Sequence, residues 1–197
     1  SILMKVAPID SFTLEQAVFI ADDPLASIVI NGLFKHNCFV NINAKTQEYH
    51  FHALFKYTLM EEAKKAGLDI KESYNRCGQW LLERKDFVAA IEYFGRAKQY
   101  DAILDIMSQY GATAYMDYVP TLISNIFKQM PLEKKLAHPI GYLTYIHSYY
   151  AYNFSSEGIT MLNEARAYYE KQEDLPNKDQ ILGECTLIQV MFPNKLT

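Results

Sequence analysis

The stretch from Tyr74 to Ala97 limits the possible folds of this 197-residue chain more than any other part of the sequence. Large and small residues alternate there at helical spacing, four or three positions apart, on two consecutive predicted helices. They are Tyr74, Gly78 and Leu81 on the first helix, and Ala90, Phe94 and Ala97 on the second. Between them lies a charged turn that ends at Asp86, a favourable N-cap residue. The small residues allow close approach and the large ones fill the gap, so the pattern predicts an antiparallel helical hairpin.

The same spacing recurs later in the chain, at Tyr142, Ile146, Tyr149, Gly158, Leu162 and Ala165. The offset from 74 to 142 is 68 residues, which is two periods of about 34, the length of a tetratricopeptide repeat. At a single period the match is poor, because Lys128 and Pro131 stand at positions that need small or apolar residues. Helical hairpins bury their apolar faces by stacking on neighbours. We therefore predict tetratricopeptide-like repeats, forming a right-handed α-superhelix, over residues 67–197. An irregular helical bundle is the alternative.

Residues 1–66 have a different pattern. Thr13 to Gln16 is a capping box that starts a helix running to about Ala21, and a second helix is predicted over Pro24–Asn37. The segments Phe39–Ile42 and Glu48–Phe51 are strand-like and are joined by a polar turn. A third helix follows over Ala53–Ala66. Helix, helix, β-hairpin and helix is the order of a winged-helix-like domain, so a mainly α protein is expected.

Binding of nucleic acid by this chain is disfavoured by its charge. The helix that would read DNA in a winged helix carries only Lys35 and His36 as phosphate contacts, and the net charge of the chain is −4. We expect the winged-helix-like domain to pack against other protein domains instead.

Further helices are predicted after the first hairpin from apolar periodicity and from the positions of proline and glycine. Their ranges are Gln99–Tyr110, Thr113–Gln129, Leu132–Ala137, Ile140–Asn153, Ser156–Lys171 and Lys178–Met191.

The cysteines and the hydropathy indicate a cytoplasmic protein. Cys38, Cys77 and Cys185 are odd in number and widely spaced, which is typical of reduced thiols. The sequence contains no apolar run of about 18 residues and no signal peptide. It starts without Met and ends directly after a helical pattern, so we expect it to be part of a longer protein.

The order of these motifs resembles the middle region of large ATP-dependent regulators of the LuxR family, the maltose-activator-like members of the STAND class of ATPases. The likeness lies in Leu25–Phe39, Tyr49–Leu59 and Cys77–Met107, and covers about residues 1–110. The family form contains Tyr-x-x-His-x-Leu-Phe, then a Trp-containing helix and an Ala-rich helix pair. The residues on this pattern are Tyr49, His52, Leu54, Phe55, Trp80, Ala90, Ala97 and Tyr100.

The resemblance implies a function for this region. In the family a nucleotide-binding domain precedes it and a helix-turn-helix domain follows, but the sequence has neither a GxxxxGK[ST] phosphate loop nor a basic recognition helix. We therefore expect a non-enzymatic relay and sensor that binds ATP or ADP only within the full-length protein. Its expected partners are the nucleotide-binding domain of its own chain and an inducer or regulatory protein on the superhelix. An oligomer is a further expectation for the activated full-length protein. The competing hypothesis is a free-standing tetratricopeptide scaffold that binds a protein or peptide.

Two other kinds of site are disfavoured. His36, Cys38, His50 and His52 are close in sequence, but they lack the ligand spacing of a zinc site. A Cys38–His nucleophile pair has no predicted oxyanion hole and no acid to orient the histidine. We expect neither a metal nor a catalytic residue.

Tyr145 and Tyr152 are candidates for a ligand or partner groove. They are seven residues apart, on a stripe next to the repeat positions Tyr142 and Tyr149, and their rings could stack on a sugar or a peptide. Core packing is the alternative for these rings.

His52 is the most specific site prediction. In the related STAND proteins a Met-His-Asp triplet stands at the strand-to-helix junction, and its histidine contacts the phosphates of bound ADP. Phe51-His52-Ala53 falls on that triplet, with Ala53 in place of the aspartate. The resemblance therefore implies that His52 contacts an ADP phosphate in the full-length protein, and that it is exposed or partly covered in this chain. The alternative is a plain structural histidine beside Phe55.

Overall fold

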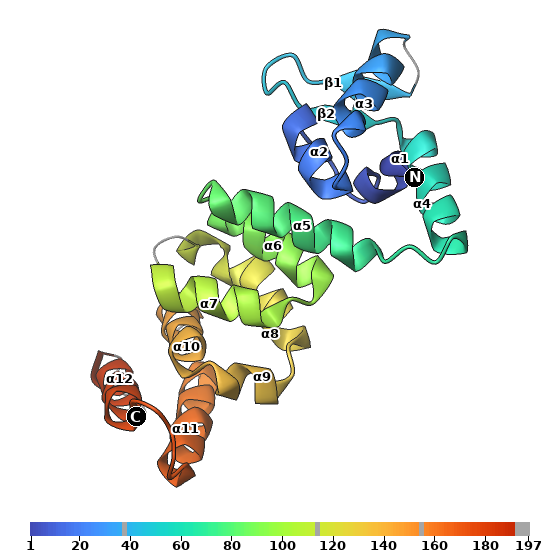
Figure 1. The fold of residues 1–197 in the computed structure, drawn as a ribbon. Coiled ribbons are helices and arrows are strands. Elements are labelled where there is room, and N and C mark those ends of the chain that lie inside the picture. Colours follow the sequence, from blue (N-terminus) through green and yellow to red (C-terminus); the bar gives the residue numbers. More distant parts are fainter. Residues whose placement is uncertain (37–38, 113–114, 154–155, 192–197) are drawn as a thin grey trace. The chain divides into compact units, whose positions relative to one another are not determined.

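The computed structural model describes residues 1–36, 39–112, 115–153 and 156–191. These residues form 12 α-helices and one two-stranded antiparallel sheet, so the protein is mainly helical (Figure 1). The chain divides into two compact units, Ser1–Lys98 and Gln99–Thr197. The predicted domains, residues 1–66 and 67–197, stay a prediction, because the compact units are defined by contacts within the structure alone.

The N-terminal unit follows the predicted order of helix, helix, hairpin and helix, with one short helix added at its start. Its elements are α1 (Ile2–Val6), α2 (Leu14–Ala21), α3 (Leu25–Lys35), β1 (Val40–Ile42), β2 (Tyr49–Phe51), α4 (Ala53–Lys65), α5 (Ile70–Glu83) and α6 (Phe87–Ala97). Helix α3 begins one residue later than expected, with Pro24 at its N-cap. The backbone N–H of Leu25 donates to the Asp23 carboxylate at 2.9 Å, so Asp23 still satisfies a free donor at this end.

Only half of the predicted capping box forms at the start of α2. The Thr13 hydroxyl accepts a hydrogen bond from the backbone N–H of Gln16 at 3.2 Å. The Gln16 side chain does not return this bond, and its amide instead donates to the Cys77 Sγ atom on α5 at 3.3 Å. Gln16, which the sequence predicts to cap α2, therefore links α2 to α5.

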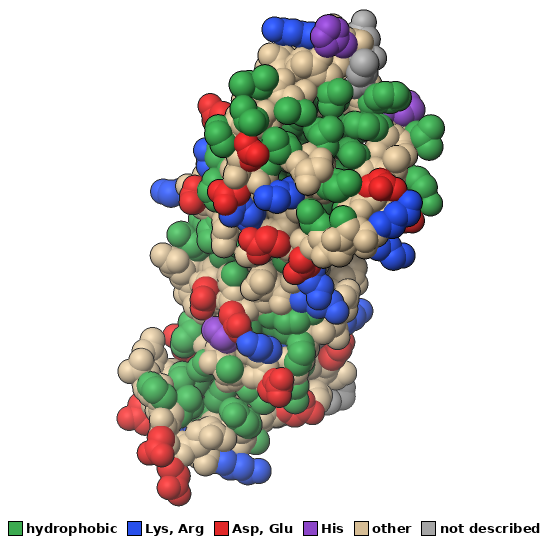
Figure 2. All heavy atoms as spheres, turned by 45° about the vertical axis from the view of Figure 1, so that its right-hand side comes forward, with side chains coloured by type: hydrophobic (Ala, Val, Ile, Leu, Met, Phe, Trp, Pro, Cys, Tyr) green, Lys and Arg blue, Asp and Glu red, His purple; other side chains and the backbone are tan. Residues whose placement is uncertain are grey.

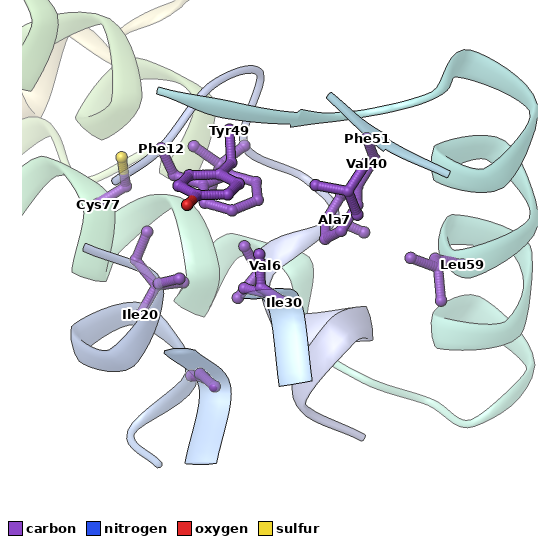
Figure 3. Packing of buried hydrophobic residues seen from close by; sticks show 14 residues of the cluster. Val6, Ala7, Phe12, Ile20, Ile30, Val40, Tyr49, Phe51, Leu59 and Cys77 are labelled. Atoms are coloured by element: carbon purple, nitrogen blue, oxygen red, sulfur yellow. The ribbon is translucent and has the colours of Figure 1, made fainter. Parts of the chain in front are cut away.

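The core of the N-terminal unit lies between its short helices and the hairpin (Figure 3). Val40 pairs with Phe51, and Ile42 pairs with Tyr49. Phe12 extends the sheet by one isolated bridge to Tyr49, with backbone bonds of 2.8 and 3.0 Å in the two directions. The rings of Phe12 and Phe51 lie 5.2 Å apart, centre to centre. The burial of these rings fixes the register, since a one-residue slip would turn them to solvent.

Helices α5 and α6 form the predicted hairpin. The Asp86 carboxylate accepts from the Ala89 backbone N–H at 3.3 Å, as a helix N-cap does. Gly78 of α5 faces the ring of Phe94 on α6, and Ala90 and Ala97 are buried on the same helix as Phe94. The large and small residues thus meet as the sequence indicated.

Helix α10 (Pro139–Asn153) lies at the centre of the C-terminal unit. The elements of this unit are α7 (Tyr100–Tyr110), the 3₁₀ turn η2 (Met116–Tyr118), the π turn η3 (Val119–Ile123), α8 (Ser124–Gln129), α9 (Leu132–Ala137), α10, α11 (Ser156–Lys171) and α12 (Lys178–Met191). The helix expected over 113–129 is therefore α-helical only from Ser124; residues 113 and 114 lie outside the described residues. Pro120 lies in this segment of the sequence, and a proline has no backbone N–H to donate within a helix.

Helix α10 packs against α7, α11 and α12. Gly141 makes the α7 contact possible, because a Cβ atom there would collide with the backbone oxygen of Leu104. Gly158 of α11 faces Tyr150 of α10, and a Cβ atom on Gly158 would lie 2.9 Å from its ring. The predicted pair of α10 and α11 therefore forms, with Tyr150 opposite the glycine.

Candidate functional site

His52 lies at the junction of β2 and α4, where the sequence placed it. Strand β2 ends at Phe51, and His52 is the N-cap residue of α4 with φ −57° and ψ 140°. Its backbone N–H donates to the Phe39 oxygen at 2.7 Å, and its backbone oxygen accepts from the Lys56 N–H at 2.9 Å. The main chain is therefore held firmly, while the side chain is exposed and makes no capping hydrogen bond.

Exposed apolar side chains surround this helix end. Phe39 is 57% exposed and its ring stacks on Phe55 at 5.0 Å. Leu54 and Tyr57, three residues apart on α4, are 70% and 64% exposed. We call Phe39, Leu54 and Tyr57 the α4 patch. Figure 2 shows hydrophobic side chains gathered over the N-terminal unit on one face of the molecule. Apolar groups that gather at a surface in this way are typical of an interaction site.

Lys56, the cationic residue of α4 nearest in sequence to His52, is paired with an acidic side chain. The ammonium of Lys56 donates to Asp10 at 2.7 Å, and Arg96 of α6 donates to the other oxygen of that carboxylate at 2.9 Å. Burial acts to raise the pKa of Asp10, but the hydrogen bonds from Lys56 and Arg96 outweigh it and hold the pKa below its ordinary value. Lys56 thus neutralises Asp10, which leaves the helix N–H groups and the His52 ring as the donors available to an anion at this end.

Tyr145 and Tyr152 lie in different surroundings, although both are on α10. Tyr145 is only 4% exposed, and its ring stacks on Phe127 with centres 3.7 Å apart and planes 10° apart. Burial raises the pKa of the Tyr145 hydroxyl. Tyr152, two turns later, is 46% exposed. Tyr145 therefore offers no open ring to a groove, while Tyr152 does; ligand binding by either residue stays untested.

The thiols that the structure describes are not suited to nucleophilic chemistry. Cys77 and Cys185 are buried and free, and burial raises their pKa values to about 12 and about 11. At neutral pH they are protonated, whereas the reactive form is the thiolate. Cys38 lies outside the described residues.

His50 and His52 lie in different elements, His50 in β2 and His52 at the N-cap of α4. His50 lies opposite Asn41 in the sheet and is half-buried, while the strand ends before His52. Within the part of the chain that the structure describes, no cluster of three or more His, Cys, Asp or Glu side chains could hold a metal ion.

A cavity of about 420 Å³ within the C-terminal unit was not predicted from the sequence. It lies between α10 and α12, and Leu143, His147 and Glu184 contribute to its lining. A sequence signal that could have indicated it is the pair Leu187 and Met191, two apolar residues four apart on α12, beside the buried stripe of Cys185 and Ile188.

Comparison of the chain with protein-family models, with curated proteins and with solved structures finds no match. Among the helices of the described residues, none combines the length and the apolar character needed to cross a bilayer.

Proposed function

We propose that this chain is a regulatory and sensor region of an ATP-dependent LuxR-family transcription activator of the STAND class. In this proposal residues 1–66 are a winged-helix-like relay that follows the nucleotide state. Residues 67–197 are a tetratricopeptide-like right-handed superhelix that receives an inducer or a regulatory protein. The region itself is non-enzymatic and binds no DNA. It acts in the cytoplasm, and the full-length protein supplies ATP or ADP binding and forms an oligomer when activated.

The observation that carries the proposal is the exposed N-terminus of α4. His52 stands at the position of the family histidine, its ring makes no capping bond, and the α4 patch lies beside it. A nucleotide-binding domain docked on that patch would bring a bound phosphate towards the free N–H groups of the first turn. Such a helix end favours an anion through its unpaired donors and its dipole. The order of α2, α3, the β-hairpin and α4 gives further support.

The departure at Ala53 limits how the histidine can act. The family aspartate would accept a bond from the imidazole and orient it, whereas an alanine side chain accepts nothing. We propose that the short connection from β2, held by the bond from the His52 N–H to Phe39, sets the position of the ring instead.

The test uses the intact protein. His52→Ala is expected to weaken ADP retention and to raise transcription without inducer, because the closed state loses a phosphate contact. His50→Ala is the matched control, since His50 lies two residues earlier within β2, outside the α4 N-terminus. A His52→Ala protein that retains ADP as the parent does would leave His52 as a structural residue.

A free-standing tetratricopeptide scaffold that binds a protein or peptide is the second candidate. It is favoured by the exposed apolar residues of α12, where Leu187, Val190 and Met191 are 53%, 69% and 53% exposed. The full translation of the gene separates the two functions. A phosphate loop upstream and a helix-turn-helix downstream support the activator, and an isolated reading frame of this length supports the scaffold.

A further inference from the structure

The cavity between α10 and α12 has the dimensions of a small-molecule site. Its volume of about 420 Å³ lies within the roughly 300–1,000 Å³ that is usual for such sites. Most of its wall is apolar and comes from Ile140, Leu143, Leu187, Ile188 and Met191. Leu143 and Ile188 are 2% and 5% exposed, so they form its floor, while Leu187 and Met191 are each 53% exposed and form its rim. The cavity is therefore an open apolar pocket within the C-terminal unit.

Three polar side chains also line this cavity. Thr144 and His147 are three residues apart on α10, which places them on the same helix face, and Glu184 comes from α12. The Thr144 hydroxyl donates its proton to the Ile140 oxygen at 2.8 Å, so its own oxygen is left as an acceptor. Burial lowers the pKa of His147, although the nearby Glu184 carboxylate acts in the opposite direction. The imidazole is consequently neutral at pH 7, and Glu184 is the charged group of the lining.

Glu184 contributes a carboxylate to the lining of the cavity. It is half-buried, and no Lys or Arg among the described residues forms an ion pair with it. The cavity-lining residues that the structure describes include no Lys or Arg. A carboxylate that is partly removed from water is stabilised by a cation placed beside it. The same charge repels ligands that carry a phosphate or a carboxylate.

We propose that this cavity binds a small molecule with an apolar body and one primary ammonium group. The apolar body packs on Leu143 and Ile188 and leaves water. The ammonium has three N–H donors and no acceptor, which matches a wall that presents the Glu184 carboxylate and the Thr144 oxygen as acceptors. The charge of the site excludes anions, and its apolar wall gives a fully hydroxylated sugar little to bind.

Binding of such an amine does not depend on the proposed function, but its role as the inducer of an activator does. The two can therefore fail separately. Loss of the predicted binding would overturn the ligand assignment and leave the His52 test as it stands, while a reading frame without a phosphate loop would overturn the activator and leave the amine site.

The test is calorimetric titration of this chain with three indole compounds of similar shape: tryptamine, tryptophol and indolepropionate. Their side chains end in an ammonium, a hydroxyl and a carboxylate. We expect tryptamine to bind about tenfold or more tightly than tryptophol, because a hydrogen bond to a charged group contributes more than a neutral one. Indolepropionate is expected to bind most weakly. Tryptamine that binds no tighter than tryptophol, or shows no binding at millimolar concentration, would overturn the proposal without any mutation.

Glu184→Gln locates the effect. This substitution keeps the shape of the side chain and removes its charge, so the preference for tryptamine over tryptophol should disappear. Glu173→Gln is the matched control, because Glu173 is exposed in the loop before α12 and does not line the cavity. The control should keep the preference. Equal losses in both variants would show a general charge effect and overturn the assignment to this cavity; circular dichroism of both variants checks that they are folded.

Discussion

Gly78 of α5 faces the ring of Phe94 on α6 so closely that a Cβ atom built on the glycine would lie 2.7 Å from two ring carbons. Phe94 is only 2% exposed, so its ring has little room to move away. The distance between the two helices is therefore set by the absence of one side chain. In this contact a small residue of one helix packs against a large residue of the other, as the alternation between residues 74 and 97 predicts.

Gly78→Ala should destabilise the N-terminal unit. Overpacking of a tight core contact costs typically about 1–3 kcal/mol, which exceeds the gain of roughly 0.5–1 kcal/mol that alanine brings to a helix interior. Gly32→Ala on α3 is the matched control, because a Cβ atom there meets nothing within 4 Å. It should stabilise the unit by that smaller amount. Urea unfolding followed by the fluorescence of Trp80, the single tryptophan, measures both. A stabilised Gly78→Ala protein would show that the hairpin is looser than the structure indicates.

Gly141→Ala should have a larger effect, in the C-terminal unit. The obstacle here is the backbone oxygen of Leu104, together with the Ser108 hydroxyl oxygen at 2.9 Å, and a backbone atom cannot rotate away as a side chain can. We expect the free energy of unfolding to fall by about 3 kcal/mol, or α7 to separate from α10. Gly183→Ala on α12 has open space around it and should be neutral or slightly stabilising. Thermal unfolding followed by far-UV circular dichroism compares the two; similar melting temperatures would contradict the α7–α10 contact.

Acid should weaken the N-terminal unit through Asp10. The pKa of this carboxyl is lowered in the folded state, so its contribution to stability is complete above the unfolded pKa of about 3.9. That contribution is lost as the pH falls through the lower, folded pKa. Because the side chain is 60% exposed, we expect less than about 1 kcal/mol at pH 7. The free energy of unfolding of the parent and of Asp10→Asn, measured by Trp80 fluorescence, should converge below pH 4. Curves that stay parallel down to pH 2 would exclude this ion pair as a source of stability.

The sequence predicts best those elements whose limits depend on local chemistry. The range of α9 agrees with its prediction, because Pro131 and Pro139 mark its two ends. The hairpin of β1 and β2 also agrees, since its alternating apolar residues face one core. The irregular turns before Ser124 were missed because the periodicity of the segment is helical and only Pro120 opposes it.

Features that depend on distant contacts could not be predicted in this way. The Gln16 side chain leaves its own cap for Cys77, which is 61 residues away in the sequence. The sequence predicts Tyr145 beside a groove, but its ring stacks on Phe127 of α8 and is buried, whereas Tyr152 on the same stripe, near the end of α10, is exposed. The cavity proposed to bind an amine also depends on distant contacts, because its polar groups Thr144, His147 and Glu184 come from α10 and α12, which share no motif.

His52 gives a final prediction that separates its structural role from its proposed role. In this chain alone, His52→Ala should change the free energy of unfolding by less than about 0.5 kcal/mol, because the ring is exposed and caps nothing. His52→Asp should stabilise the chain by about 0.5–2 kcal/mol, since the backbone already has an N-cap conformation and a carboxylate can accept from the first turn of α4. Urea unfolding followed by Trp80 fluorescence measures both variants. A His52→Ala chain that loses more than about 1 kcal/mol would show a structural role, and a change in ADP retention by the intact variant could then be explained by misfolding. With the stability unchanged, such a change can be assigned to the lost contact between the imidazole and the phosphate.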